Sequence, residues 1–282
     1  MIENLQSQRI RPIGVFDSGV GGLTVLRALR SHMPTEHYLY LGDTARLPYG
    51  SKSPETIQRY SLQAAEFLVN RGIKCLVVAC NTASATALPL LQQRFDSIPV
   101  IGVVEPGATA GCAASSTGRI GVIATESTVQ GGAYQRAIHR LRRDAFVIAH
   151  ACPLFVALAE EGWTSGPIVE SIAHRYLEMM FSVADAPDTL LLGCTHFPVL
   201  REALQKVVGP QVHLVDSAET TATALKALLQ SRQLVNDISL SGSAAFMATD
   251  GRERFARVAA HFLDQALSGG EVELIEPTFA IK

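Results

Sequence analysis

The sequence lacks several features that would reveal a class of protein at once. None of its apolar runs approaches the roughly 18 residues of a membrane-spanning helix, and its first dozen residues are too polar for a secretory signal. Its 24 Lys and Arg against 26 Asp and Glu give a net charge of -2, which provides no electrostatic footprint for nucleic acid or an anionic membrane. We therefore expect a cytoplasmic protein that binds neither nucleic acid nor a membrane.

Cysteine and lysine are both scarce. The five cysteines stand at positions 75, 80, 112, 152 and 194, an odd number without C-x-x-C spacing. A chain of 282 residues can bury a core without covalent staples, so a disulfide scaffold and a structural metal site are both disfavoured. The five lysines lie outside the strand-end segments discussed below, which disfavours a Schiff base with pyridoxal phosphate.

Short apolar runs alternate with amphipathic stretches along the whole chain. The runs that read as strands cover residues 13–16, 37–41, 75–79, 100–103, 120–124, 146–148, 190–192 and 212–215. Apolar residues at three- and four-residue spacing predict helices over residues 23–32, 54–70, 129–143, 168–181, 200–208 and 220–230. Strands that are apolar on both faces need helices on both sides, so the pattern predicts a doubly wound α/β fold with mainly parallel sheets.

A short internal similarity suggests that the α/β unit is duplicated. The segments LVVACNT (76–82) and LLLGCTH (190–196) both read as a strand, a small residue, a cysteine and polar residues. Their cysteines are separated by about one domain length. The segment 105–117 is rich in small residues, and it is either a place where the chain changes course or a closely packed helix.

The segment DSGVGG (17–22) is a candidate ligand-binding loop. The carboxylate of Asp17 follows the first predicted strand, and three glycines allow the backbone to approach a ligand closely. It is not a dinucleotide fingerprint, because Thr24 stands where the third glycine is needed. The alternative is a tight turn in which Asp17 caps the following helix.

Cys80 and Cys194 each follow a predicted buried strand and precede a helix, where the helix dipole favours a thiolate. One isolated cysteine is best interpreted as a packing residue, but two in the same structural position favour chemistry. Two thiols on opposite sides of one carbon suit racemisation, because a thiol pKa of about 8.5 lets one rest as thiolate while the other stays protonated. His196 either tunes the nearby Cys194 thiol or caps the next helix.

Five segments in order resemble the glutamate racemases of the aspartate/glutamate racemase superfamily. They are FDSGVGGLT (16–24), GDTARLPYG (42–50), ACNTAS (79–84), ACPLFV (151–156) and LGCTHFP (192–198). The Cys-Thr-His form and the DSGVGG opening are similar to the glutamate enzymes rather than to the aspartate racemases, which typically carry Cys-Thr-Glu.

The resemblance implies a cofactor-independent interconversion of L- and D-glutamate that supplies D-glutamate for peptidoglycan. It implies that Cys80 and Cys194 are the acid/base pair, with Asp17 and His196 assisting proton transfer or orienting the thiols. The residues that it implies for holding the substrate are Asp17, Ser18, Tyr49, Gly50, Asn81, Thr82, Thr195 and His196.

Glu160 is the further catalytic candidate. Its surroundings alone favour a solvated helix residue, but the resemblance places an acidic site residue after the CPLFV run, either Glu160 or its neighbour Glu161. The implied partner is L- or D-glutamate as a small-molecule substrate, without cofactor or metal, and a homodimer is expected.

The resemblance also implies two α/β domains related by a pseudo-twofold axis, with the active site in the cleft between them. The first domain would comprise residues 1–102 and 212–282, because the C-terminal part returns to complete it, and the second would comprise residues 103–211. Two rival functions stay open. A cysteine hydrolase with Cys194 as nucleophile and His196 as base would leave Cys80 idle, and an amino-acid-binding protein would bind glutamate without exchanging its Cα proton.

Overall fold

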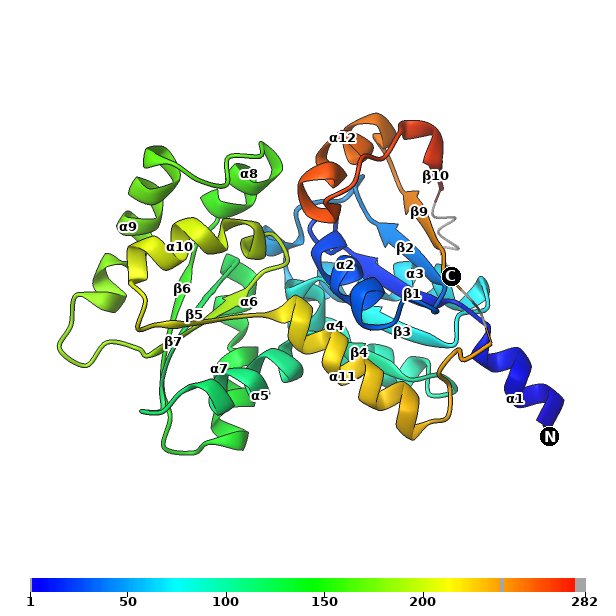
Figure 1. Ribbon diagram of the computed structural model, residues 1–282, viewed down its shortest axis with the longest axis horizontal. Helices are drawn as coiled ribbons and strands as arrows, with labels where there is room; N and C mark the ends of the chain where they lie inside the picture. Colours follow the sequence, from blue (N-terminus) through cyan, green and yellow to red (C-terminus); the bar gives the residue numbers. More distant parts are fainter. Residues whose placement is uncertain (1, 239–240, 277–282) are drawn as a thin grey trace.

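The computed structural model describes residues 2–238 and 241–276, which form two parallel sheets side by side (Figure 1). The first sheet contains β1 (Ile13–Asp17), β2 (Tyr38–Gly42), β3 (Cys75–Val78), β4 (Val100–Gly102), β9 (Ala244–Ala248) and β10 (Val272–Leu274). The second contains β5 (Arg119–Ala124), β6 (Phe146–Ala151), β7 (Thr189–Gly193) and β8 (His213–Asp216). Every pairing is parallel, as the apolar strand pattern predicts.

Helices connect these strands. They are α1 (Ile2–Arg9), α2 (Leu23–His32), α3 (Pro54–Asn70), α4 (Asn81–Arg94), α5 (Val104–Ala114), α6 (Glu126–Gly131), α7 (Ala133–Leu141), α8 (Leu154–Glu160), α9 (Pro167–Phe181), α10 (Arg201–Val208), α11 (Ser217–Ser231) and α12 (Arg252–Leu263). Short 3-10 turns lie at η1 (Tyr49–Ser51), η2 (Phe197–Leu200) and η3 (Gly269–Glu271). Within residues 2–238 and 241–276, no helix has the length and apolar character needed to cross a membrane.

Both sheets are buried on both faces. Because side chains alternate along a strand, Ile13 and Val15 of β1 pack with α2, α11 and α12, whereas Phe16 packs with α3 and α4. In the second sheet, Val122 of β5 joins α5 and α7, and Ile123 joins α8 and neighbouring helices. The doubly wound arrangement predicted from the sequence is thus confirmed.

The two sheets repeat one topology. The order β2-β1-β3-β4 in the first sheet matches β6-β5-β7-β8 in the second. Cys80 follows β3 and Cys194 follows β7, so the two cysteines occupy equivalent places, as their similar segments suggest. The extra strands β9 and β10 extend the first sheet beyond β2, which brings the C-terminal part of the chain back to that sheet.

The structure adds detail to the sequence-based expectations at three places. Strand β8 pairs with β7, so the residues just after the predicted boundary at 211/212 complete the second sheet, and α11 then packs mainly on α2. The single helix expected over 129–143 is two helices, because Gly132 adopts a left-handed conformation with φ 64° between them. Segment 105–117 is largely the closely packed helix α5, whose Gly111 lies against Leu191.

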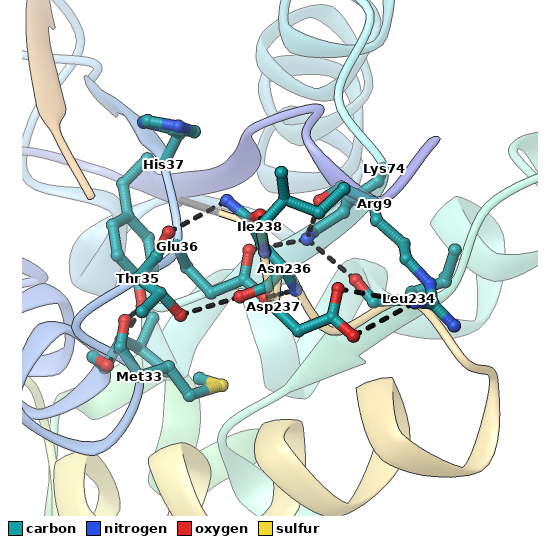
Figure 2. A network of polar contacts seen from close by, with 12 residues as sticks. Arg9, Met33, Thr35, Glu36, His37, Lys74, Leu234, Asn236, Asp237 and Ile238 are labelled. Atoms are coloured by element: carbon teal, nitrogen blue, oxygen red, sulfur yellow. Dashed lines mark hydrogen bonds and ion pairs between the residues drawn. The ribbon is translucent and has the colours of Figure 1, made fainter. Parts of the chain in front are cut away.

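A buried ion pair lies at the amino ends of the strands of the first sheet (Figure 2). The Lys74 Nζ is 2.5 Å from Glu36 Oε2, and the two side chains are 1% and 0% exposed. Lys74 also donates to the carbonyls of Arg9 and Leu234, while Glu36 accepts the backbone N–H of Asn236. The pair therefore fastens the end of α1 and the segment after α11 to the sheet.

Candidate active site

The loops that follow the central strands of the two sheets meet one another. Thr24, at the start of α2, donates its hydroxyl to the Thr195 carbonyl after β7 at 2.9 Å. Thr82 Oγ1, after β3, is 2.9 Å from Thr125 Oγ1, after β5. A Cβ added to Gly21 would collide with His196. The carboxyl ends of both sheets, at the points where the strand order reverses, thus enclose one common site.

Asp17 ends β1 and is fully buried at this junction. Its Oδ2 accepts the backbone N–H of Gly19 at 2.9 Å, but no described group bonds to Oδ1. Burial raises the pKa of Asp17 above its usual value, although His196 and nearby backbone N–H groups act in the opposite direction. An unpartnered oxygen on a buried carboxyl can accept a hydrogen bond from a ligand.

Cys80 is the N-cap residue of α4. Its thiol donates to Ser18 Oγ at 3.4 Å, and its sulfur accepts the Ala83 N–H at 3.5 Å. Burial, with the negative charge of Asp17 as the next contribution, raises the pKa of Cys80 to about 12. At neutral pH the group is therefore a thiol, despite its position at a helix N-terminus.

Cys194 belongs to a polar chain that crosses between the sheets. Its Sγ is 3.8 Å from His196 Nδ1, and His196 Nε2 is 3.2 Å from Glu160 Oε1. Arg254 donates to Glu160 Oε2 at 2.7 Å. Burial lowers the pKa of His196, but hydrogen bonds to Cys194 and Glu160 outweigh it and raise that pKa to about 10. His196 is consequently an imidazolium at neutral pH and donates to both partners.

A cavity of about 420 Å³ opens beside these groups. Its lining includes Ser18 and His196, each hydrogen-bonded to one of the two thiols. The other lining residues are Gly19, Leu47, Pro48, Gly50, Ser51, Thr125, Glu126, Pro153, Val156, Ala157 and Glu160. The hydrogen-bonding partner of each thiol therefore reaches the cavity, Ser18 from the side of the first sheet and His196 from the side of the second.

Four of the predicted substrate-holding residues are engaged in internal contacts. Asn81 accepts the Tyr134 hydroxyl at 2.7 Å, and Thr82 bonds to the threonines that begin α6. Thr195 supplies the carbonyl that joins α2 to the second sheet. The Tyr49 hydroxyl donates to Asp43, and its side chain is buried, so Tyr49 does not line the cavity although its neighbours do.

The structure distinguishes the two adjacent glutamates. Glu160 reaches His196 and lines the cavity, whereas Glu161 is exposed at the end of α8. Sequence reasoning missed Thr125, Arg254 and Phe262, whose ring meets the His196 ring edge-on at 5.3 Å between centroids. The position of Thr125 directly after a strand could have revealed it, but nothing local marks the other two.

Comparison with known proteins gives a consistent result. The Asp/Glu/Hydantoin racemase family matches residues 23–225. A glutamate racemase of Geobacter metallireducens is 50% identical over 253 residues, covering 90% of this chain and 93% of that protein. One from Syntrophus aciditrophicus is 45% identical, covering 95% and 98%.

Two solved structures are also similar. Glutamate racemase isoform RacE1 of Bacillus anthracis has a TM-score of 0.89 at 38% identity, covering 94% of this chain and 97% of that one. The glutamate racemase of Francisella tularensis, solved in complex with D-glutamate, has a TM-score of 0.87 at 36% identity and covers 96% and 99%.

Proposed function

Because the chain belongs to the Asp/Glu/Hydantoin racemase family, we propose that it interconverts L- and D-glutamate without a cofactor, with Cys80 and Cys194 as the acid/base pair. The observation that carries this assignment is the equivalent placement of the two cysteines. Each follows the same strand of a repeated topology, and each bonds to a residue that lines one cavity. A hydrolase would need only one of these thiols.

The reaction transfers one proton off the Cα of glutamate and one proton onto its opposite face. Cys80 carries its proton at neutral pH, since its pKa is about 12, and is the acid of the resting site. The His196 imidazolium donates to the Cys194 sulfur and is placed to balance the negative charge that this sulfur carries when Cys194 acts as the base. After the transfer Cys194 is protonated and Cys80 is the thiolate, ready for the other enantiomer.

The carbanion that forms between these steps needs stabilisation from hydrogen bonds aimed at its carboxylate. The backbone N–H groups at the start of α4, together with the Ser18 and Thr125 hydroxyls, are suitable donors. The unpartnered Oδ1 of Asp17 suits the substrate ammonium. Gly50 keeps the cavity wall close to the second sheet, because a Cβ there would press on Thr125.

The family resemblance extends the proposal to the cell. The enzyme supplies D-glutamate for peptidoglycan in a bacterial cytoplasm, its partner in the site is glutamate, and it acts as a homodimer. The same proposal divides the chain into one domain of residues 1–102 and 212–282 and another of residues 103–211. Strand β8 pairs with β7 of the second sheet, which favours placing residues 213–216 in the second domain instead.

Proton NMR in deuterated water tests the activity. We expect the Cα proton signal to disappear from L-glutamate and from D-glutamate, each with formation of the other enantiomer, without added pyridoxal phosphate. Binding without loss of that signal would favour an amino-acid-binding protein, and covalent trapping of an acyl group from an amide substrate would favour a hydrolase.

A further inference from the structure

Two helices that belong to different sheets meet at Glu160. Helix α12 packs on the first sheet through Phe255, Val258 and Phe262, whereas α8 packs on the second through Phe155. Figure 1 shows α12 above β9 and β10, with α8 at the same end of the other half of the molecule. The helices are joined where Arg254 of α12 reaches the last residue of α8.

The two oxygens of Glu160 are divided between two partners. Oε1 lies 3.2 Å from His196 Nε2, and Oε2 accepts from Arg254 at 2.7 Å. The Glu160 side chain is only 13% exposed, whereas that of Arg254 is 49% exposed. Arg254 therefore binds from the solvent side and fixes the plane of a largely buried carboxylate whose other oxygen faces the imidazole.

The same helix also supports the imidazole directly. Phe262, fully buried, meets the His196 ring edge-on with an angle of 82° between the planes. Arg254 and Phe262 lie eight residues apart, about two helical turns, so one helix contacts both members of the His196–Glu160 pair.

We propose that Arg254 is a positioning residue, which from the C-terminal helix of the first sheet keeps Glu160 ionised and aimed at His196 beside the Cys194 base. The proposal rests on the proposed racemase function and adds to it a residue that positions the His196–Glu160 pair. The first sheet then supplies the Cys80 thiol and, through α12, also holds the carboxylate of Glu160 that hydrogen-bonds to His196 on the second sheet.

The direction of the effect follows from the charges around the pair. The charged and titratable groups that face it are Asp17 from β1, Cys194 from the loop after β7, and Arg254 from α12. Burial raises the pKa of Glu160, but His196 and Arg254 outweigh it and hold that pKa below its usual value. Without Arg254 the carboxylate should take up a proton at higher pH and stop accepting from the imidazolium.

The direct test is the titration of Glu160 by carbon NMR of protein labelled at the glutamate side-chain carboxyls, with Glu160→Gln to assign the signal. In Arg254→Gln we expect the inflection to rise by about half to one pH unit, a range reduced for the exposure of the guanidinium. Arg254→Lys should fall between the two. Arg257→Gln is the matched control, since Arg257 is exposed on the same helix and bonds to no other described residue.

Activity provides a second readout. Racemisation has an equilibrium constant of one, so kcat/KM is the same from either enantiomer, and its acid limb should move upward with the Glu160 inflection in Arg254→Gln. An unmoved inflection, or a uniform loss of activity and melting temperature at every pH, would overturn the role assigned to Arg254. A wild-type protein that titrates as expected but does not exchange the Cα proton would instead overturn the racemase function.

Discussion

The protonation state of Cys80 offers a quantitative test of the site. With a pKa of about 12, roughly one Cys80 in ten thousand is a thiolate at pH 8. An unperturbed thiol with a pKa of about 8.5 is about a quarter ionised at that pH. Alkylation by iodoacetamide requires the thiolate, so the logarithm of the Cys80 alkylation rate should rise by one unit per pH unit from pH 6 to 10 without an inflection.

The assay follows the Cys80 peptide by mass spectrometry after timed alkylation, quenching and digestion. Poor access of the reagent scales every rate equally and does not move an inflection, so the pH at which the curve bends reports the pKa alone. The urea-unfolded chain serves as the reference and should bend near pH 8.5. In Asp17→Asn the rate at a given pH should increase, because the carboxylate contributes to the raised pKa.

An inflection near pH 8 to 9 in the folded wild-type protein would refute this reasoning. It would mean that the N-cap position on α4 outweighs burial and the neighbouring charge. The resting site would then no longer have a defined acid on the side of the first sheet.

Three further predictions concern separate parts of the molecule. Glu160→Gln removes an acceptor that favours the neighbouring imidazolium, so the basic limb of kcat/KM, expected near pH 10, should move down by about one to two units. Gly21→Ala puts a methyl group against His196 and Thr195, and kcat/KM should fall at least tenfold while the circular dichroism spectrum is retained. Lys74→Met leaves Glu36 buried without its partner, and urea unfolding should show a loss of about 3–5 kcal/mol.

Each of these three variants has a matched control. Glu161→Gln, at the exposed neighbouring position, should leave the pH profile unchanged, and an equal shift there would contradict the role of Glu160. Gly131→Ala should be silent, because a Cβ there meets no atom within 4 Å. Lys206→Met removes an exposed ion pair and should cost no more than about 1 kcal/mol, so a similar loss in both lysine variants would refute the burial argument.

Much of the fold could be predicted because the central strands are buried on both faces. Continuous apolar runs such as 75–79 and 190–192 show their structure locally, and the two cysteines that follow them share a sequence pattern. Strand β9, with the sequence AAFMA, lies between β10 and β2, but it lacks the β-branched residues that mark a strand and went unrecognised. The position of β8 depends on pairing with β7, which no local pattern records.

From the residues' own context, the candidate site was predictable only where its residues follow strands, whereas Glu160 and Gly50 were named through the family resemblance. Asp17, Cys80 and Cys194 stand at strand ends, where parallel sheets collect ligands, and the structure brings them together. Arg254 lies on a surface helix among other arginines, and only the meeting of α8 with α12 distinguishes it. Tyr49 was named through the resemblance, and no pattern in the sequence records that its hydroxyl donates to Asp43 and that its side chain does not line the cavity.

The central claim is that two thiols act on opposite faces of one carbon. Its most direct test is the early incorporation of deuterium by the wild-type protein, Cys80→Ala and Cys194→Ala, each given a single enantiomer of glutamate in deuterated water. The account predicts that wild-type deuterium appears first in the product enantiomer and that both variants lose racemisation by about a hundredfold or more. Substantial racemisation by either variant, or equal early labelling of substrate and product by the wild type, would contradict it.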